Sequence, residues 1–326
     1  MLCIQRDSTN PYFNLAAEEY VLKNYPENIF MLWQNEPCII VGKHQNTLAE
    51  INPDFVNRNN IPVVRRISGG GTVFHDLGNL NFTFISNGDE EKLVNFRKFT
   101  DPVIEVLQNL GLDARFEGRN DITVGGRKIS GNAEHVHKNR ILHHGTLLFS
   151  SQLTDLSDAL RVSPEKFHDK AVKSVRSRVT NISEHLTEKM NVIEFKNRIL
   201  DHIVSKYKDV KMTVFSTDDV RAINKLVEEK YGTWEWNYGY SPGYSFRKMI
   251  KANGGSMEFL LDVQNGIIRE AKIYGDYFGV RDAEEIEQML KNVPHHPAQL
   301  KEKLKNINLS LYFSNITREE FLSGLF

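Results

Sequence analysis

Residues 65–76 read Arg-Arg-Ile-Ser-Gly-Gly-Gly-Thr-Val-Phe-His-Asp: two arginines end an apolar run, and three consecutive glycines follow. Three glycines lose much backbone entropy on folding, so a stable protein keeps them where a side chain would be in the way. Next to paired guanidinium groups, we expect an anionic ligand lying close to bare backbone N–H groups. The alternative is a flexible surface turn, which the neighbouring arginines disfavour.

The common nucleotide-binding fingerprints do not describe this motif. No Gly-Lys-Ser/Thr follows the glycines, as a Walker loop requires. A strand-like run at 80–85 follows them, where a dinucleotide-binding turn would open a helix. A second glycine-rich stretch at 118–131 carries both charges and small residues. Together the two stretches indicate an enzyme that handles a phosphorylated or acyl-phosphate species.

The composition predicts a soluble protein of two domains. The 326 residues suffice for two cores, and 41 basic against 42 acidic residues give a net charge of −1. That balance argues against a nucleic-acid binder. Cys3 and Cys38, the only cysteines, form no disulfide framework or metal knuckle. The chain shows no signal peptide and no apolar run of the ~20 residues that a membrane span needs, so we expect a cytoplasmic protein with no membrane partner.

Alternating short apolar runs and amphipathic segments predict an α+β fold. Expected strands are 29–33, 38–41, 61–67, 80–85, 140–149 and 212–215, and expected helices are 11–23, 53–59, 89–110, 153–160, 164–170, 192–207 and 217–231. The aromatic stretch 234–244 breaks this rhythm. We therefore expect a catalytic domain at 1–240 and a small α+β accessory domain at 245–326, with a hairpin turn at Asn265-Gly266 and a surface pair at His295-His296.

The pair Gly125-Gly126, between two short alternating runs, also predicts a hairpin. The expected register pairs Val124 with Arg127, Thr123 with Lys128, Ile122 with Ile129 and Asp121 with Ser130. Period-two alternation then places the polar side chains on one face: Asp121, Thr123, Lys128 and Ser130. With an ordinary lysine pKa of ~10.4, Lys128 is a fixed positive charge at pH 7 and suits an active-site wall. The alternative is a solvated hairpin lysine.

Several other residues have both a functional and a structural interpretation. The histidines His75, His143 and His144 could bind a metal, but their spacing is not that of a ligand set, which favours hydrogen-bonded structural histidines. Cys38 lies in an apolar run, where a buried thiol is more common than a nucleophile. Arg178 lies in a basic, polar segment that is either a solvated mobile loop or a phosphate clamp.

Taken together, these motifs resemble those of bacterial lipoate–protein ligases. The matching stretches occur in the family's order at 65–76, 118–121, 127–131, 143–146 and 174–181, and 234–237 resembles the segment before the family's accessory domain. The resemblance implies the mixed fold shared with biotin ligases and lipoyl or octanoyl transferases. It also implies that ATP and lipoate react to give lipoyl-AMP, from which a lysine of a lipoyl domain takes the lipoyl group. The acceptors would be E2 subunits of 2-oxoacid dehydrogenases or the glycine-cleavage H protein.

The resemblance also assigns the site. Lys128 matches the lysine that contacts the lipoyl carbonyl and the phosphate, and Asp121 is the expected Mg²⁺ ligand. The remaining ATP- and lipoyl-AMP-binding residues that it implies are Arg66, Gly71, Thr72, Val73, Phe74, Asn120, Ser130, His144 and Arg178. The segment 173–181 would close over the adenylate. Val73, Phe74 and Leu148 are expected to contribute to an apolar slot for lipoate.

Two other functions stay open at the sequence level. A lipoyl or octanoyl amidotransferase would carry the acyl group on a cysteine thioester, but both cysteines lie away from the motifs. A non-catalytic lipoate or nucleotide sensor would keep the pocket without the reaction, and the presence of Lys128 disfavours it.

Overall fold

A computed structural model describes residues 1–88, 95–118, 120–153, 159–160, 167–169, 179–277 and 279–326. The chain forms two compact units: unit 1 comprises Met1–Lys43, Ile61–Ala159 and Ser174–Thr233, and unit 2 comprises His44–Asn60, Leu160–Lys173 and Trp234–Phe326. Because unit 2 takes two segments from within the first 240 residues, no single cut separates the units. The division into domains at 1–240 and 245–326 stays a prediction.

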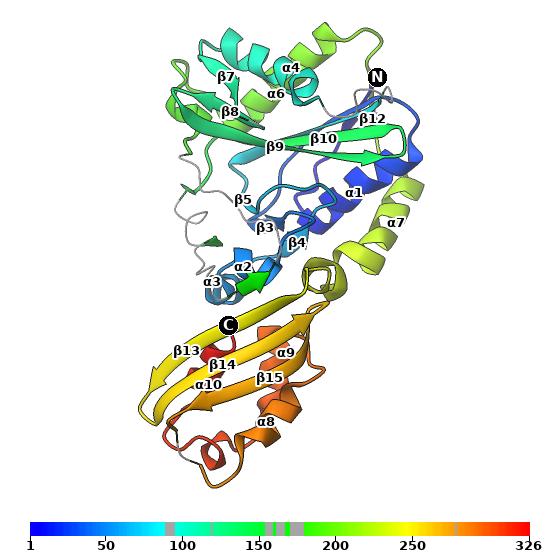
Figure 1. Cartoon of the computed structure of the whole chain (residues 1–326). Helices are drawn as coiled ribbons and strands as arrows, with labels where there is room; N and C mark the ends of the chain where they lie inside the picture. Colours follow the sequence, from blue (N-terminus) through cyan, green and yellow to red (C-terminus); the bar gives the residue numbers. More distant parts are fainter. Residues whose placement is uncertain (89–94, 119, 154–158, 161–166, 170–178, 278) are drawn as a thin grey trace. The chain divides into compact units, whose positions relative to one another are not determined.

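Unit 1 is built on an eight-stranded sheet in the order β12-β1-β2-β6-β10-β9-β8-β7 (Figure 1). Its strands are β1 (Leu2–Gln5), β2 (Ile29–Trp33), β6 (Asn79–Asn87), β7 (Ala114–Glu117), β8 (Asp121–Val124), β9 (Arg127–His137), β10 (Arg140–Leu148) and β12 (Lys211–Val214). Strand β1 runs parallel to β12 and β2, and the other neighbours are antiparallel. The central strand β6 is buried at all but its last residue, so its side chains face packed layers on both sides.

Helices cover both faces of this sheet. Helices α4 (Phe96–Asn109) and α6 (Val192–Lys206) lie on one side, and α1 (Pro11–Asn24) lies on the other (Figure 1). Helix α1 begins where the sequence predicts, because Asn10 caps it by accepting from Phe13 N and Pro11 is its first residue. Helix α7 (Thr217–Leu226) continues as a π-helical turn, η3 (Val227–Tyr231). The expected helix at 89–110 begins at Phe96; residues 89–94 lie outside the described part.

A smaller three-stranded sheet completes unit 1, in the order β4-β3-β5. It consists of β4 (Val63–Arg65), β3 (Cys38–Val41) and β5 (Val73–His75), with the short 3-10 turn η2 (Ile182–Glu184) elsewhere in the unit. Strands β4 and β5 are the two ends of the glycine-rich stretch 65–76, and both pair with β3. The glycine turn is therefore held at its base by one buried strand.

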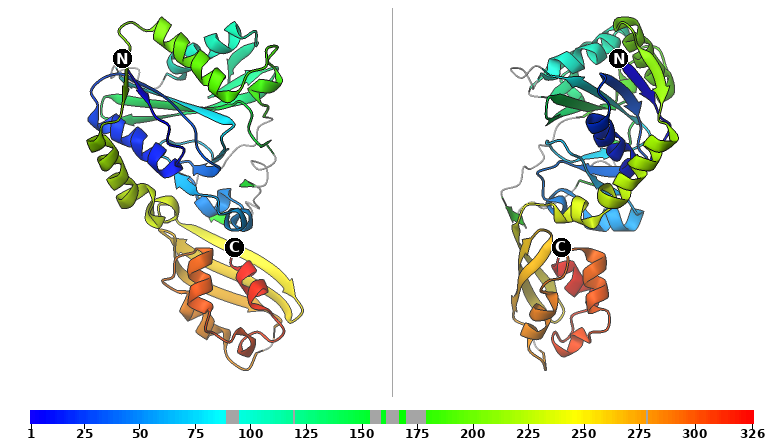
Figure 2. Two further views of the ribbon diagram at one scale, coloured as in Figure 1. Left: turned by 180° about the vertical axis from the view of Figure 1, so that it is seen from behind. Right: turned by 90° about the vertical axis from the view of Figure 1, so that its right-hand side faces the viewer.

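Unit 2 is a four-stranded sheet, β11-β13-β14-β15, with helices on one face (Figure 2). Its elements are α2 (Thr47–Glu50), α3 (Pro53–Asn59), β11 (Phe167–Asp169), η4 (Glu235–Gly239), β13 (Tyr244–Ala252), β14 (Gly255–Gln264), β15 (Ile267–Gly275), α8 (Ala283–Leu290), α9 (Pro297–Leu304), η5 (Leu309–Leu311) and α10 (Arg318–Gly324). The hairpin at Asn265-Gly266 forms as predicted, with φ of 51° and 68°. The fold class, α+β with mixed sheets and a small C-terminal domain, is confirmed.

Two local predictions in unit 2 are wrong. The segment expected as a helix at 164–170 contains the strand β11, because the backbone of Phe167–Asp169 pairs with β13. His295, expected on the surface, is 1% exposed. Its ring nitrogens lie 2.5 Å from the Tyr244 hydroxyl and 2.6 Å from Leu325 O, so two partners make its burial tolerable.

No helix within the described ranges is long and apolar enough to cross a membrane.

Candidate active site

The β8–β9 hairpin turns at Gly125 and Gly126, which both have positive φ. Val124 pairs with Arg127 and Thr123 with Lys128, as the sequence predicts. The ladder then shifts by one residue, so that Ile122 faces Ser130 and Asp121 faces Gly131. The predicted pairings of Ile122 with Ile129 and of Asp121 with Ser130 are therefore wrong, because a bulge adds one residue to β9.

This shift decides where the Lys128 side chain lies. Its Nζ is 2.8 Å from Asp121 Oδ1, and a Cβ on Gly131 would come within 3.1 Å of Nζ. A side chain at position 131, opposite Asp121, would therefore press on the end of the lysine and displace it. Both side chains of the ion pair are about one quarter exposed, 26% and 28%, so the pair can meet a ligand from outside.

The glycine turn wraps around the Arg66 guanidinium. Arg66 Nη2 donates to Gly69 O (2.6 Å) and Gly71 O (2.8 Å), and Nη1 and Nε donate to Ile40 O and Ser68 Oγ. Gly70 has φ +92°, and a Cβ there would lie 2.9 Å from Nη2. Burial lowers the pKa of Arg66 to about 10, with Glu18 opposing the shift. The side chain is thus a buried cation that fixes the shape of the turn.

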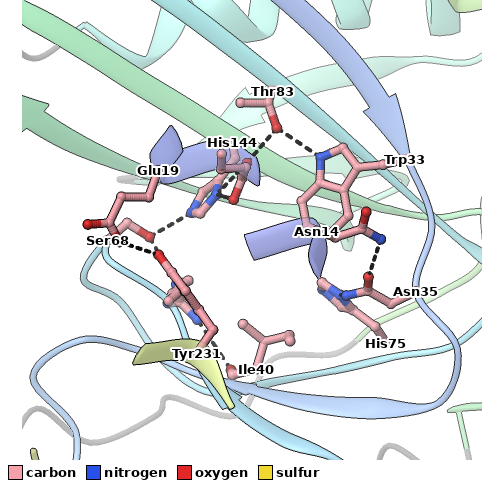
Figure 3. A network of polar contacts seen from close by, with 12 residues as sticks. Asn14, Glu19, Trp33, Asn35, Ile40, Ser68, His75, Thr83, His144 and Tyr231 are labelled. Carbon is pink, nitrogen blue, oxygen red and sulfur yellow. Dashed lines mark hydrogen bonds and ion pairs between the residues drawn. The ribbon is translucent and has the colours of Figure 1, made fainter. Parts of the chain in front are cut away.

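A chain of hydrogen bonds connects this turn to the large sheet (Figure 3). Ser68 Oγ is 2.6 Å from His144 Nε2, and His144 Nδ1 is 3.0 Å from Glu18 Oε2. Thr83 donates to Glu18, and the Trp33 indole donates to Thr83. Burial favours the neutral acid at Glu18, but His144, Thr83 and Arg6 outweigh it and lower its pKa. Glu18 is therefore a buried carboxylate that orients His144.

The other two histidines are also engaged by protein groups. His75 Nδ1 lies 3.1 Å from Asn35 Nδ2 (Figure 3), and burial, together with the nearby Arg66 and His144, lowers its pKa to about 3. His143 Nδ1 lies 2.9 Å from Glu134. Among the described residues, no group of three His, Cys, Asp or Glu side chains could hold a metal ion.

The remaining candidates divide between two places. Asn120 and Ser130 belong to the hairpin: Asn120 Nδ2 donates to Asn132 O at 2.6 Å, and Ser130 Oγ accepts from Asn132 Nδ2. Thr72, Val73 and Phe74 belong to the glycine turn and β5, where Thr72 and Phe74 are buried and Val73 is partly exposed. Arg178 lies outside the described residues.

Sequence reasoning missed the residues that connect these elements. Glu18, Trp33 and Thr83 come from α1, β2 and β6, which are distant in the chain. The one local signal was the pair of acidic residues Glu18 and Glu19 among the apolar residues of a helix whose buried positions include both of them. A buried carboxylate requires partners, so either glutamate could have been marked as part of a polar network, although not with these partners.

Residues 10–204 match the lipoyl protein ligase A/B catalytic domain, and residues 241–325 match the bacterial lipoate protein ligase C-terminus. The chain belongs to the lipoate–protein ligase family. It is 45% identical to the lipoate-protein ligase LplJ of Bacillus subtilis, over the whole of both chains. It is 46% identical to lipoate–protein ligase 1 of Staphylococcus aureus, over 96% of each. The predicted family and enzyme class, an ATP-dependent ligase that joins lipoate to protein, are confirmed.

Solved structures of lipoate–protein ligases share the fold. A Thermoplasma acidophilum protein with bound lipoic acid superimposes with a TM-score of 0.63 at 26% identity, covering 73% of this chain and 98% of that one. A lipoate-protein ligase A bound with ATP gives the same TM-score, identity and coverage. The ligase LipL1 of P. falciparum in complex with lipoate covers 99% of this chain and 97% of its own, with a TM-score of 0.62 and 24% identity, and so shows the fold alone.

Proposed function

We propose that this ligase works in two steps at the Lys128 hairpin and the glycine turn. In the first, a lipoate carboxylate oxygen attacks the α-phosphorus of ATP, forming lipoyl-AMP and releasing pyrophosphate. In the second, an acceptor lysine amine attacks the lipoyl carbonyl, AMP leaves, and the amine loses a proton. Activation is needed because attack on the free carboxylate would have to expel oxide. The observation that carries this proposal is the partly exposed Lys128–Asp121 pair at 2.8 Å.

Lys128 supplies positive charge where negative charge develops. In the first step negative charge builds up on the α-phosphate oxygens and the leaving pyrophosphate, and in the second on the lipoyl carbonyl oxygen and the departing AMP phosphate. A fixed cation stabilises these transition states. At ~4 Å, one such charge contributes about 4 kcal/mol at an effective dielectric near 20, or roughly a thousandfold in rate if the charge develops only in the transition state. In the ion pair with Asp121, the ammonium is already oriented before substrate arrives.

Arg66 acts on the nucleotide through the turn that it holds. Its guanidinium donates to the carbonyls of Gly69 and Gly71, so its charge and the shape of the turn are set together. The backbone of Gly71 and Thr72 would then meet the adenylate, since Gly71 has no side chain to keep an anion away and the Thr72 side chain is buried. Asn120, Ser130 and Arg178 complete the nucleotide-binding set in this proposal.

Asp121 would hold Mg²⁺ together with the nucleotide phosphates. Mg²⁺ is commonly bound through one or two carboxylates, with water and phosphate oxygens filling the other positions. A single partly exposed carboxylate fits that pattern. The ion would neutralise phosphate charge when bound, while Asp121 also keeps Lys128 in place.

The apolar part of lipoate would lie along β5 and the sheet. Val73, Phe74 and Leu148 offer apolar side chains there, and His144 would contact the ligand from the Glu18 network. Acceptor lipoyl domains of 2-oxoacid dehydrogenase E2 subunits or of the glycine-cleavage H protein are the proposed partners. One T. acidophilum relative is described together with its E2 lipoyl domain. A cytoplasmic location is part of the same proposal.

Mass spectrometry of an apo lipoyl domain tests the function directly. The domain is incubated with this protein, lipoate and MgATP, and we expect one lipoyl adduct on one lysine. Omitting ATP should abolish the adduct, and adding EDTA should do so if Mg²⁺ is required. Tight lipoate binding without any adduct, under conditions where a Bacillus subtilis LplJ control modifies the domain, would contradict the ligase proposal and support a sensor.

A further inference from the structure

A buried chain of polar contacts runs behind the β8–β9 hairpin. Glu134 Oε1 lies 2.9 Å from His143 Nδ1, and His143 Nε2 lies 3.3 Å from Asn132 Oδ1. Asn132 Nδ2 donates in turn to Asn120 O at 3.1 Å. The Glu134 and His143 side chains are 4% and 0% exposed. The chain therefore connects the buried interior to the residue just before Asp121.

Asn120 and Asn132 are clamped together by three hydrogen bonds. Asn120 O accepts from both the backbone N–H and the side-chain amide of Asn132, at 2.9 and 3.1 Å. Asn120 Nδ2 donates back to Asn132 O at 2.6 Å. Asn120 precedes Asp121, and Asn132 follows Gly131, the residue opposite Asp121 in the ladder. The clamp thus fixes both strands beside the position where the Lys128 ammonium lies.

The packing around Asn132 favours one orientation of its amide. Nδ2 donates to Asn120 O and Ser130 Oγ, which leaves Oδ1 toward His143 Nε2, where it accepts a hydrogen bond in the tautomer that carries the ring proton on Nε2. Gly145, opposite Asn132 on β10, has no side chain where a Cβ would overlap Asn132 Oδ1 and the Phe82 ring. A glycine inside a strand weakens that strand, which indicates that the space is needed.

His143 is itself held rigidly. Its ring stacks between Phe99 and Phe82, with centroids 5.0 and 5.9 Å away, and Glu134 fixes Nδ1. These contacts restrict the movement of the imidazole. A displacement of the Asn132 amide would require the packed core behind it to move, and a packed core deforms little.

We propose that Asn132 is a positioning residue for the ligase reaction: held by His143 and Glu134, it fixes the Asn120 peptide and so the place of Asp121 and Lys128. The inference rests on the role proposed above for Lys128. It assigns to Glu134, His143 and Gly145 a function in setting the geometry of a site that none of them touches. Displacement of a reacting group by about 1 Å can cost on the order of a hundredfold in rate.

Lipoate-dependent ATP–pyrophosphate exchange, which isolates the first step, tests the proposal. Asn132→Ala should lower kcat about tenfold while the KM for lipoate stays within about twofold, because orientation in the transition state is lost and not the binding of the acyl chain. Gly145→Ala, which keeps Glu134, His143, Asn132 and Asn120 but displaces the Asn132 side chain, should give the same split. The matched control is Asn87→Ala, which removes the hydrogen bond from Arg140 Nη1 at the other end of β10. Its kcat should stay within about twofold of the parent.

The outcomes separate this inference from the proposed function. A folded Asn132→Ala protein with unchanged kcat would overturn it, as would a loss that appears only in KM or appears equally in Asn87→Ala. If Gly145→Ala does not fold, the kcat of Asn132→Ala still tests the proposal. Lys128→Ala is measured in parallel. If it is inactive while Asn132→Ala is normal, only the positioning role of Asn132 is wrong. If Lys128→Ala is active, the proposed role of Lys128 is wrong as well.

Discussion

Thr180 donates its backbone N–H to the Lys128 carbonyl oxygen at 3.0 Å, and Val179 forms a parallel bridge with the same residue. Where the described chain resumes at Val179, it is therefore attached to β9 at the lysine. The lysine backbone is held from this side, and its side chain is held by Asp121 on the other. If the segment before Val179 closes over the adenylate, as the family resemblance implies, its end is anchored to the residue proposed to contact the reacting group.

Lys128→Ala should abolish lipoyl-AMP formation in a protein that remains folded. Asp121, its ion-pair partner, is 28% exposed and can reach water once the lysine is gone, so the fold should survive, whereas the lost charge contributes roughly a thousandfold to the rate. Acid-quenched single turnovers with labelled ATP measure the adenylate directly. Arg127→Ala, at the exposed neighbouring position, is the matched control and should keep its activity. Near-normal adenylate formation by Lys128→Ala would remove the lysine from the mechanism.

Gly70→Ala should raise the KM for ATP while Arg66 is still present. Its φ of +92° disfavours any other residue, and the new Cβ would lie 2.9 Å from Arg66 Nη2. Arg66→Ala should raise the KM for ATP as well, and should also cost several kcal/mol of stability because four carbonyl and hydroxyl acceptors lose their donor. ATP saturation curves and urea unfolding separate the two effects. Unchanged nucleotide kinetics in both variants would contradict the role of the turn.

The elements near the site followed from local pattern, but the contacts between them did not. The Gly125-Gly126 turn, the strands on either side and the closeness of Asp121 and Lys128 could be predicted, because alternation and turn chemistry are local. The bulge could not, since the alternation of the two strands does not show where one of them takes an extra residue. Inserting one residue in the ladder placed Gly131, rather than Ser130, opposite Asp121.

The same distinction between local pattern and contacts across the fold explains why the partners of Arg66 were not predicted. Paired arginines beside three glycines indicated an anion site, but periodicity cannot tell whether an arginine points to a ligand or to its own backbone. Arg66 donates to Ile40 O and Ser68 Oγ, and the charge of Glu18 acts on its guanidinium. These contacts bring together residues from different elements, so they depend on tertiary packing and not on local sequence.

Cys38→Ser should retain substantial ATP-dependent activity. The thiol is fully buried, and burial raises its pKa well above the ordinary value despite a hydrogen bond from Asn35, so little nucleophilic thiolate forms. Intact-mass analysis during turnover should detect no acyl adduct on this cysteine. Cys3→Ser, another buried thiol whose pKa is raised to about 11, serves as the comparison. Complete loss in folded Cys38→Ser, with acyl transfer independent of ATP in the parent, would favour an amidotransferase.

Glu19 should make unit 1 sensitive to acid. Burial alone would raise its pKa, but hydrogen bonds from Lys23, Lys230 and Tyr231, all at 2.6 Å, hold the pKa at about 2, below the ordinary value of 4.5. Because the unfolded state binds the proton more tightly, this stabilisation is complete above pH 4.5 and disappears as the pH falls toward 2. A shift of this size corresponds to about 3 kcal/mol.

Glu19→Gln should therefore be less stable than the parent at pH 6 and should lose less stability between pH 5 and about pH 3. Urea unfolding at both pH values measures the difference, and Glu117→Gln, at an exposed position of β7, is the matched control that should follow the parent. The carboxylate joins α1 to the π-helical turn η3, so hydrogen exchange in 227–231 should accelerate in the same pH window. If parent and Glu19→Gln lose stability in parallel, the acid sensitivity arises elsewhere, and Glu18, the other buried carboxylate of α1, becomes the next candidate.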